Sequence, residues 1–216
     1  MSELQQLAIP LSQVQIEAAI EFWRKDGGET PEILQLKRVF PNCDEAVGVK
    51  AMAVNALYGT NIRAITKAGD CVTNVLKGKH STGPELVEDL VAEMHRAMGR
   101  NNYSFAAKYA HFFIDSTLPI LDWYAEWMVG QHLGRSMRSK SQKRYIKFTD
   151  EVETLKRTAG LKCSCADLDK YLWMAGEYRY WKAHPKTRIS AWLKPHFDTL
   201  GTSPENEPDL AKAFGL

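Results

Sequence analysis

Apolar positions along this chain recur at the three- and four-residue spacing of amphipathic helices, and no long stretch alternates as a strand would. The first such segment, residues 12–25, carries a broad apolar stripe that stops at an Asp-Gly-Gly sequence. The same reasoning predicts helices at residues 30–40, 44–58, 61–67, 70–77, 85–98, 145–158 and 167–184, with further helices around Lys108 and after Asp122. The sequence therefore predicts an all-α protein.

The length of 216 residues and the hydrophobic content of 44% are enough to bury a proper core. We expect one helical domain over residues 1–216, built as two helical lobes with a cleft between them. Its expected parts are a core at 51–130 with a hairpin near 99–104, basic C-terminal helices at 131–200, and a loose tail at 201–216 with at most a short helix at 209–214. Because there is no apolar run of 18 residues and no signal peptide, we expect a cytoplasmic protein that does not contact membranes.

The net charge of +2 hides an uneven distribution of charge along the chain. Residues 130–200 hold 15 Lys and Arg against 7 Asp and Glu, whereas the remaining residues hold 13 against 19. Two runs, 130–149 and 178–197, contain no acid and are interleaved with aromatic residues. Basic runs are often only solvated surface, but this pattern also suits contact with a phosphate backbone.

The most informative stretch is residues 102–128, NYSFAAKYAHFFIDSTLPILDWYAEWM. It places Lys108 in an aromatic helix and Asp122 at the start of the next helix, behind a proline and two aliphatic residues. A carboxylate at a helix start stays ionised and well oriented, because the helix terminus is electropositive. Its ordinary structural role would be an N-cap. A carboxylate held in this way could also stabilise a cation.

Two segments of the chain resemble the helix-hairpin-helix DNA glycosylases. The first is the helix, short hairpin, helix and aspartate of residues 85–128, in which PILDWYAEWMV resembles the family's PILDGNVKRV-type segment. The second, residues 54–65, is similar to the segment of 8-oxoguanine DNA glycosylases that pushes an asparagine into the duplex. The matches follow the family's order and cover roughly residues 51–130. The connection Gly99-Arg100-Asn101-Asn102 departs from the family's usual Gly-x-Gly hairpin.

The resemblance implies roles for particular residues. Asp122 would stabilise the deoxyribose as it gains positive charge, and Lys108 would be the nucleophile if a water-poor pocket keeps its amine neutral. The family's lysine and aspartate usually stand further apart, so either the Lys108 helix is one turn shorter here or Ser104 occupies the lysine's place and water attacks. The residues expected at the base pocket or as the wedge in the duplex are Tyr58, Thr60, Asn61, His111, Phe112, Trp123 and Trp173. Those expected at the DNA backbone are Arg100, Asn102, Arg135, Arg138, Lys140, Lys143 and Arg144.

These features predict a DNA N-glycosylase that flips a damaged or modified base out of double-stranded DNA and excises it, with AP-lyase activity if Lys108 attacks. Oxidised purines and bulky phage cytosines, such as glucosylated hydroxymethylcytosine, are both candidate bases, so the role is either repair or antiviral defence. A non-catalytic helical DNA-binding or interaction protein is the alternative. Such a protein would use the basic runs and leave Asp122 as an ordinary cap, whereas a solvent-reachable cleft containing both Asp122 and Lys108 would favour the enzyme. Separately, Lys108 could be a surface lysine, and the aromatic residues could be core. We expect a monomer without metal or cofactor, since the cysteines and histidines lack metal-ligand spacing and no phosphate-binding Gly-rich loop is present.

Overall fold

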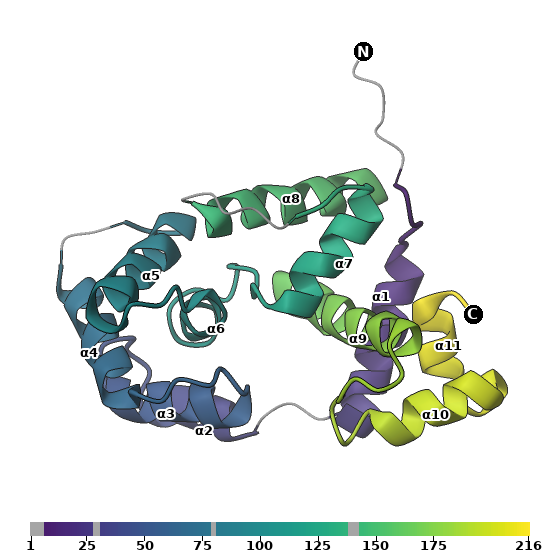
Figure 1. The fold of residues 1–216 in the computed structure, drawn as a ribbon, viewed down its shortest axis with the longest axis horizontal. Coiled ribbons are helices and arrows are strands. Elements are labelled where there is room, and N and C mark those ends of the chain that lie inside the picture. The colour runs from purple at the N-terminus through teal and green to yellow at the C-terminus, as the bar shows by residue number, and fades with distance from the viewer. Residues whose placement is uncertain (1–6, 28–30, 79–80, 138–142) are drawn as a thin grey trace, which may run out of the picture. The chain divides into compact units, whose positions relative to one another are not determined.

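The computed structural model describes residues 7–27, 31–78, 81–137 and 143–216 (Figure 1). All regular secondary structure in these residues is helical, which confirms the predicted all-α class. The helices are α1 (Gln13–Phe22), α2 (Pro31–Val39), α3 (Val47–Leu57), α4 (Ile65–Lys77), α5 (Pro84–Met98), α6 (Tyr103–Phe113), α7 (Trp123–Leu133), α8 (Arg144–Ala159), α9 (Cys165–Ala183), α10 (Lys194–Thr202) and α11 (Pro208–Phe214). A π-helical turn, Trp23–Gly27, follows α1, and a 3-10 turn, Pro204–Asn206, precedes α11.

The chain forms two compact units, neither of which is a single continuous segment. Unit 1 comprises Met1–Glu29, Trp123–Arg138 and Glu151–Leu216. Unit 2 comprises Thr30–Asp122 and Ser139–Asp150. Helix α8 therefore begins in unit 2 and ends in unit 1.

Unit 2 is built around α6, in which eight of the eleven residues are buried. Helix α5 turns its apolar stripe inward, and α3 packs against both α4 and α6. Helix α4 runs unbroken from Ile65 to Lys77, so the prediction of two shorter helices at 61–67 and 70–77 was wrong. Gly69 stands inside this helix, where a single glycine weakens the helix by about 1 kcal/mol relative to alanine without ending it. A Cβ built on Gly69 would lie in ordinary van der Waals contact with Gly48 of α3.

Unit 1 groups α1, α7, α9, α10 and α11, with α1 packed against α9 and α11 and α7 against α9 (Figure 1). The segment 201–216 is not the loose tail expected from its sequence, because α11 buries Leu210, Ala213 and Phe214. The Phe214 ring stacks on Tyr178 with centroids 4.9 Å apart, and Lys25 donates to Asp209 at 2.8 Å. Such a short helix between prolines and a glycine gains its stability from these tertiary contacts, which local sequence does not reveal.

In the part of the chain that the structure describes, no helix is long and apolar enough to cross a bilayer. The same residues contain no group of three or more His, Cys, Asp or Glu side chains suited to hold a metal ion.

Candidate active site

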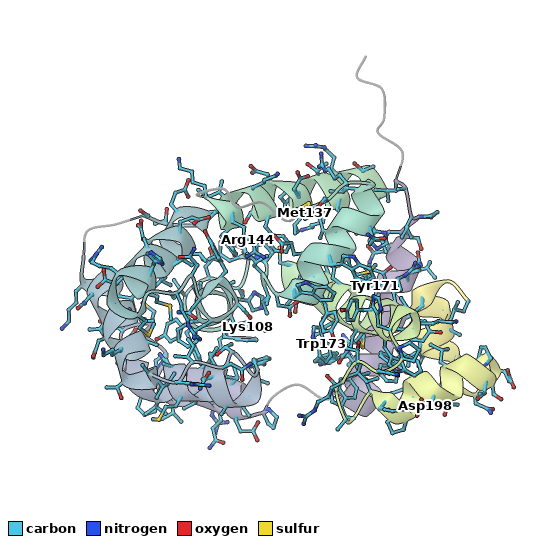
Figure 2. The ribbon with its side chains drawn as sticks, in the orientation of Figure 1. Lys108, Met137, Arg144, Tyr171, Trp173 and Asp198 are labelled. Carbon is cyan, nitrogen blue, oxygen red and sulfur yellow. The ribbon has the colours of Figure 1, made fainter. Side chains whose placement is uncertain are left out.

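Lys108 and Asp122 meet within unit 2 (Figure 2 labels Lys108 on α6). Lys108 lies in the middle of α6, whereas Asp122 is the last residue before α7. The Lys108 Nζ is 3.6 Å from the Asp122 Oδ2, and the two side chains are only 10% and 12% exposed. An ion pair with this little solvent is screened less than a surface pair, so each charge strongly influences the other.

Two further groups surround the Lys108 ammonium. Its Nζ donates a hydrogen bond to the Ser104 Oγ, one helical turn earlier, at 3.2 Å. The same nitrogen lies 5.9 Å from the centre of the Tyr58 ring, which stacks on Phe112 at 4.7 Å. A carboxylate, a hydroxyl and a ring face thus hold the amine in one place. The two residues that the sequence offers for the nucleophile's position, Lys108 and Ser104, are therefore hydrogen-bonded to each other.

Two buried side chains hold the segment that leads to Asp122. The His111 Nδ1 donates to the carbonyl of Leu118 at 2.7 Å, and the Tyr145 hydroxyl donates to the carbonyl of Pro119 at 2.7 Å. His111, which was predicted to line a base pocket, is buried, and its Nδ1 bond holds the backbone ahead of Asp122.

The predicted wedge lies in the connection between α3 and α4. Asn61 is exposed and adopts a left-handed backbone conformation with φ of 57°, and its side chain donates to the Gly59 carbonyl at 2.9 Å. Asn55 of α3 holds this turn, because its Oδ1 accepts from the Thr60 hydroxyl and the Ile62 N–H, both at 2.8 Å. Its Nδ2 donates to the Ile62 carbonyl at 3.1 Å. Thr60 therefore supports the turn and Asn61 stands at its tip.

Trp123 and Trp173 both belong to unit 1, where each joins an aromatic cluster. Trp123 stacks on Trp127 at 5.8 Å and meets the edge of Tyr180 at 4.5 Å. These three rings line a hollow of about 770 Å³ within unit 1, whose lining includes neither Lys108 nor Asp122. Trp173 packs instead against Trp23 and Trp192, at 5.9 and 6.2 Å.

The hairpin residues predicted at the DNA backbone lie between α5 and α6. Gly99 ends α5 in a left-handed conformation, as a C-terminal cap should. The Asn102 side chain donates to the Arg100 carbonyl at 3.2 Å, and Arg100 itself is exposed.

The other residues predicted to contact the DNA backbone differ in whether their charge is already paired within the protein. Lys143 is exposed, and Arg144 lies over the Tyr103 ring at 5.4 Å. Arg135 is ion-paired with Glu151, so part of its charge is already neutralised inside unit 1. Arg138 and Lys140 lie outside the described residues.

Sequence reasoning missed Glu88 and Tyr145, which join the two chain segments that carry the ion pair. Glu88 accepts from the Tyr103 hydroxyl at 3.0 Å and from the Tyr145 N–H at 2.6 Å. Burial, reinforced by the nearby Glu88 carboxylate, raises the pKa of Tyr103 to about 12. No local motif marks a glutamate on an amphipathic helix for such a role, since its partners lie 15 and 57 residues away.

A family model described as the HI_0787_N N-terminal domain matches residues 15–117. The matched region includes Asn61 and Lys108 and ends before Asp122. No curated protein and no solved structure matches the chain.

Proposed function

We propose that this protein is a DNA N-glycosylase that flips a modified base out of double-stranded DNA and excises it. The observation that carries the proposal is the ion pair between Lys108 and Asp122, which is nearly closed to water and is held at 3.6 Å. A merely structural lysine gains little from burial beside a single carboxylate, because desolvation offsets most of the attraction. A carboxylate beside the amine can accept its proton when the amine attacks, and it can stabilise positive charge on the sugar, so the arrangement suits the proposed reaction.

The chemistry follows from the two groups. As the bond between C1′ and the base nitrogen breaks, its electron pair leaves with the base and the sugar gains oxocarbenium character. The Asp122 carboxylate stabilises that positive charge. Water then attacks C1′ and gives its proton to Asp122, which leaves an abasic site. In the lyase branch Asp122 takes a proton from the Lys108 ammonium and the resulting amine attacks C1′. The C1′–O4′ bond then opens as a proton moves from the nitrogen to O4′, which leaves a Schiff base between Lys108 and C1′.

Asn61 provides the second part of the proposal. Base excision requires the target nucleotide to leave the stack, and a side chain that fills the gap stabilises the extruded state. Asn61 is exposed at the tip of a turn whose shape Asn55 fixes. Such a turn presents one polar side chain outward, as a wedge must.

The base is either an oxidised purine or a bulky cytosine such as glucosylated hydroxymethylcytosine, which correspond to repair and to antiviral defence. Incubation with oxidised, alkylated and glucosylated duplexes, followed by detection of released bases and abasic sites, identifies the class. Binding without release from any of these duplexes would support the non-catalytic DNA-binding alternative and overturn the enzyme.

The Asp122→Asn variant tests the carboxylate. We expect excision to fall by about 100-fold or more, because the charge that stabilises the sugar is lost, while binding to unmodified duplex is not weakened. Asp115→Asn is the matched control, since that carboxylate lies in the same connection and accepts hydrogen bonds from the Thr117 N–H and hydroxyl. Full excision by Asp122→Asn would refute the role of Asp122.

Lys108→Gln separates the two chemical branches. Borohydride reduces a Schiff base to a stable amine, so the native protein should form a covalent adduct with DNA and the variant should not. Lys67→Gln, a change at an exposed lysine of α4, serves as control. Excision without any adduct from the native protein assigns the reaction to water.

A further inference from the structure

Tyr145 anchors the chain just ahead of Asp122. Its hydroxyl donates to the Pro119 carbonyl at 2.7 Å, three residues before the carboxylate, and its ring is fully buried. The ring of a proline already fixes φ at that position. A hydrogen bond on the same residue's carbonyl therefore leaves little freedom in the direction from which the chain enters Asp122.

Glu88 of α5 fixes Tyr145 in turn. Its Oε1 accepts from the backbone N–H groups of Tyr145 and Ile146, at 2.6 and 3.3 Å. These donors belong to the first turn of α8, where N–H groups lack helical partners and a negative charge is favourable. The bond is therefore both charge-assisted and geometrically defined.

The second oxygen of Glu88 reaches the helix that carries Lys108. Its Oε2 accepts from the hydroxyl of Tyr103 at 3.0 Å, and Tyr103 is the first residue of α6. One carboxylate thus connects the start of α6 to the residue that anchors the approach to Asp122. The residues of this connection all belong to unit 2; they are Glu88, Tyr103, Pro119, Tyr145 and Ile146.

We propose that Tyr145 and Glu88 are positioning residues, which set the separation between Lys108 and Asp122 without touching the substrate. The inference rests on the proposed function, because it assigns a catalytic purpose to that separation. Displacing a catalytic group by about 1 Å costs about 100-fold in rate, so a lost anchor should slow the reaction while leaving DNA binding intact.

Tyr145→Phe in the full chain tests the proposal, since it removes one hydroxyl and keeps the ring. We expect the single-turnover excision rate to fall by about 10- to 100-fold, with the affinity for DNA unchanged. The matched control is Tyr109→Phe. Tyr109 is another fully buried tyrosine of unit 2, and its hydroxyl donates to a backbone carbonyl, that of Cys43, at 3.3 Å.

The two tyrosine variants separate positioning from stability. Both lose one buried hydrogen bond and should unfold at similarly lowered temperatures, but only Tyr145→Phe should excise slowly. Equal excision by the two variants, whether both normal or both reduced, would overturn the inference. For Glu88, the Gln variant keeps an oxygen for the α8 N–H groups, so it should restore most of the rate that Glu88→Ala loses.

A readout independent of excision distinguishes failure of this inference from failure of the proposed function. The ¹³C resonance of the Asp122 carboxylate, assigned with the Asp122→Asn variant, reports its surroundings directly. It should move in Tyr145→Phe and stay in place in Tyr109→Phe. If the resonance does not move in Tyr145→Phe, Tyr145 does not position Asp122. If the resonance moves but the native protein excises no base, the glycosylase proposal is wrong, while the structural effect of Tyr145 on Asp122 stands.

Discussion

His132 is a histidine that the fold keeps neutral. It is fully buried in unit 1, where its Nδ1 donates to the Ile9 carbonyl at 2.9 Å. Its Nε2 then accepts from the Tyr171 hydroxyl at 3.2 Å, which leaves no site for a second proton. Burial, the dominant cause, lowers the pKa of His132 from 6.5 to about 4.

This histidine predicts acid sensitivity with a defined window. Below pH 6.5 the unfolded chain binds a proton at His132 that the folded protein refuses, so the free energy of unfolding falls as the pH drops toward 4. The loss over that window is on the order of 3 kcal/mol. Urea unfolding at pH 7.5 and pH 5 measures the first part of that loss, which is about 2 kcal/mol.

Two variants isolate the contribution of His132. His132→Gln should unfold with a weaker dependence on pH, although it is less stable at neutral pH. His95→Gln changes an exposed histidine of α5 and should keep the native dependence. An undiminished acid sensitivity in His132→Gln would assign the effect to other groups.

The candidate pair itself could be predicted from sequence, because Lys108 and Asp122 stand in one short aromatic segment with a helix boundary between them. The groups that support the pair could not. Glu88 and Tyr145 act through hydrogen bonds to backbone groups 57 and 26 residues away, and neither hydropathy nor spacing encodes those partners. Asn55 bonds a backbone group only seven residues away, but its amide side chain carries no signal for the turn that it holds. The backbone bond of His111 could not be predicted either, since an aromatic helix does not show which carbonyl a ring nitrogen reaches.

Among helices, the contact of α7 with α9 depends on a glycine. A Cβ at Gly176 would lie 2.9 Å from both the Cβ and the backbone oxygen of Tyr124. Gly176→Ala should therefore lower the free energy of unfolding by about 1–3 kcal/mol, despite the better helix propensity of alanine. Thermal unfolding followed by circular dichroism measures the loss.

Gly69→Ala is the comparison for that variant. At Gly69 the added Cβ would meet only the Gly48 Cα at 3.5 Å, which is ordinary van der Waals contact. The variant should be as stable as the native chain or gain up to about 1 kcal/mol from helix propensity. If both variants lose a similar free energy of unfolding, the closer contact at Gly176 does not explain the effect of its substitution.

Periodicity located most helices because their buried faces are long and regular. It failed where a helix is short, and it placed a helix boundary next to Gly69, where α4 continues. Helix α10 was read only as part of a basic run, and α11 as part of a loose tail, although Phe197 and Phe214 are both buried. Their burial depends on Tyr178 of α9, which contacts both rings and lies far from them in sequence.

Across the molecule, a net charge of only +2 gives little long-range attraction for a polyanion. Any grip on DNA must come from local groups of exposed cations. We predict that Arg100→Ala and Lys143→Ala each weaken duplex binding and lower the slope of log Kd against log salt concentration by about 1. Titration at several salt concentrations measures both quantities.

Arg135→Ala provides the contrast for that titration. Glu151 already neutralises Arg135, so its removal should change the salt slope less than removal of the exposed Arg100 or Lys143. Weak and salt-insensitive binding by the native protein would instead exclude a phosphate footprint.

The asparagine-held turn at Gly59–Asn61 has a thermodynamic consequence for encounters with a duplex. Fixing a free backbone costs about 1–2 kcal/mol per residue, and a floppy loop would incur that cost at each binding event. In this protein the turn is already ordered in the folded unit 2, because Asn55 forms hydrogen bonds with Thr60 and Ile62. Under the proposed function, the tip would meet each base pair already ordered, and no loop would have to be ordered at every encounter.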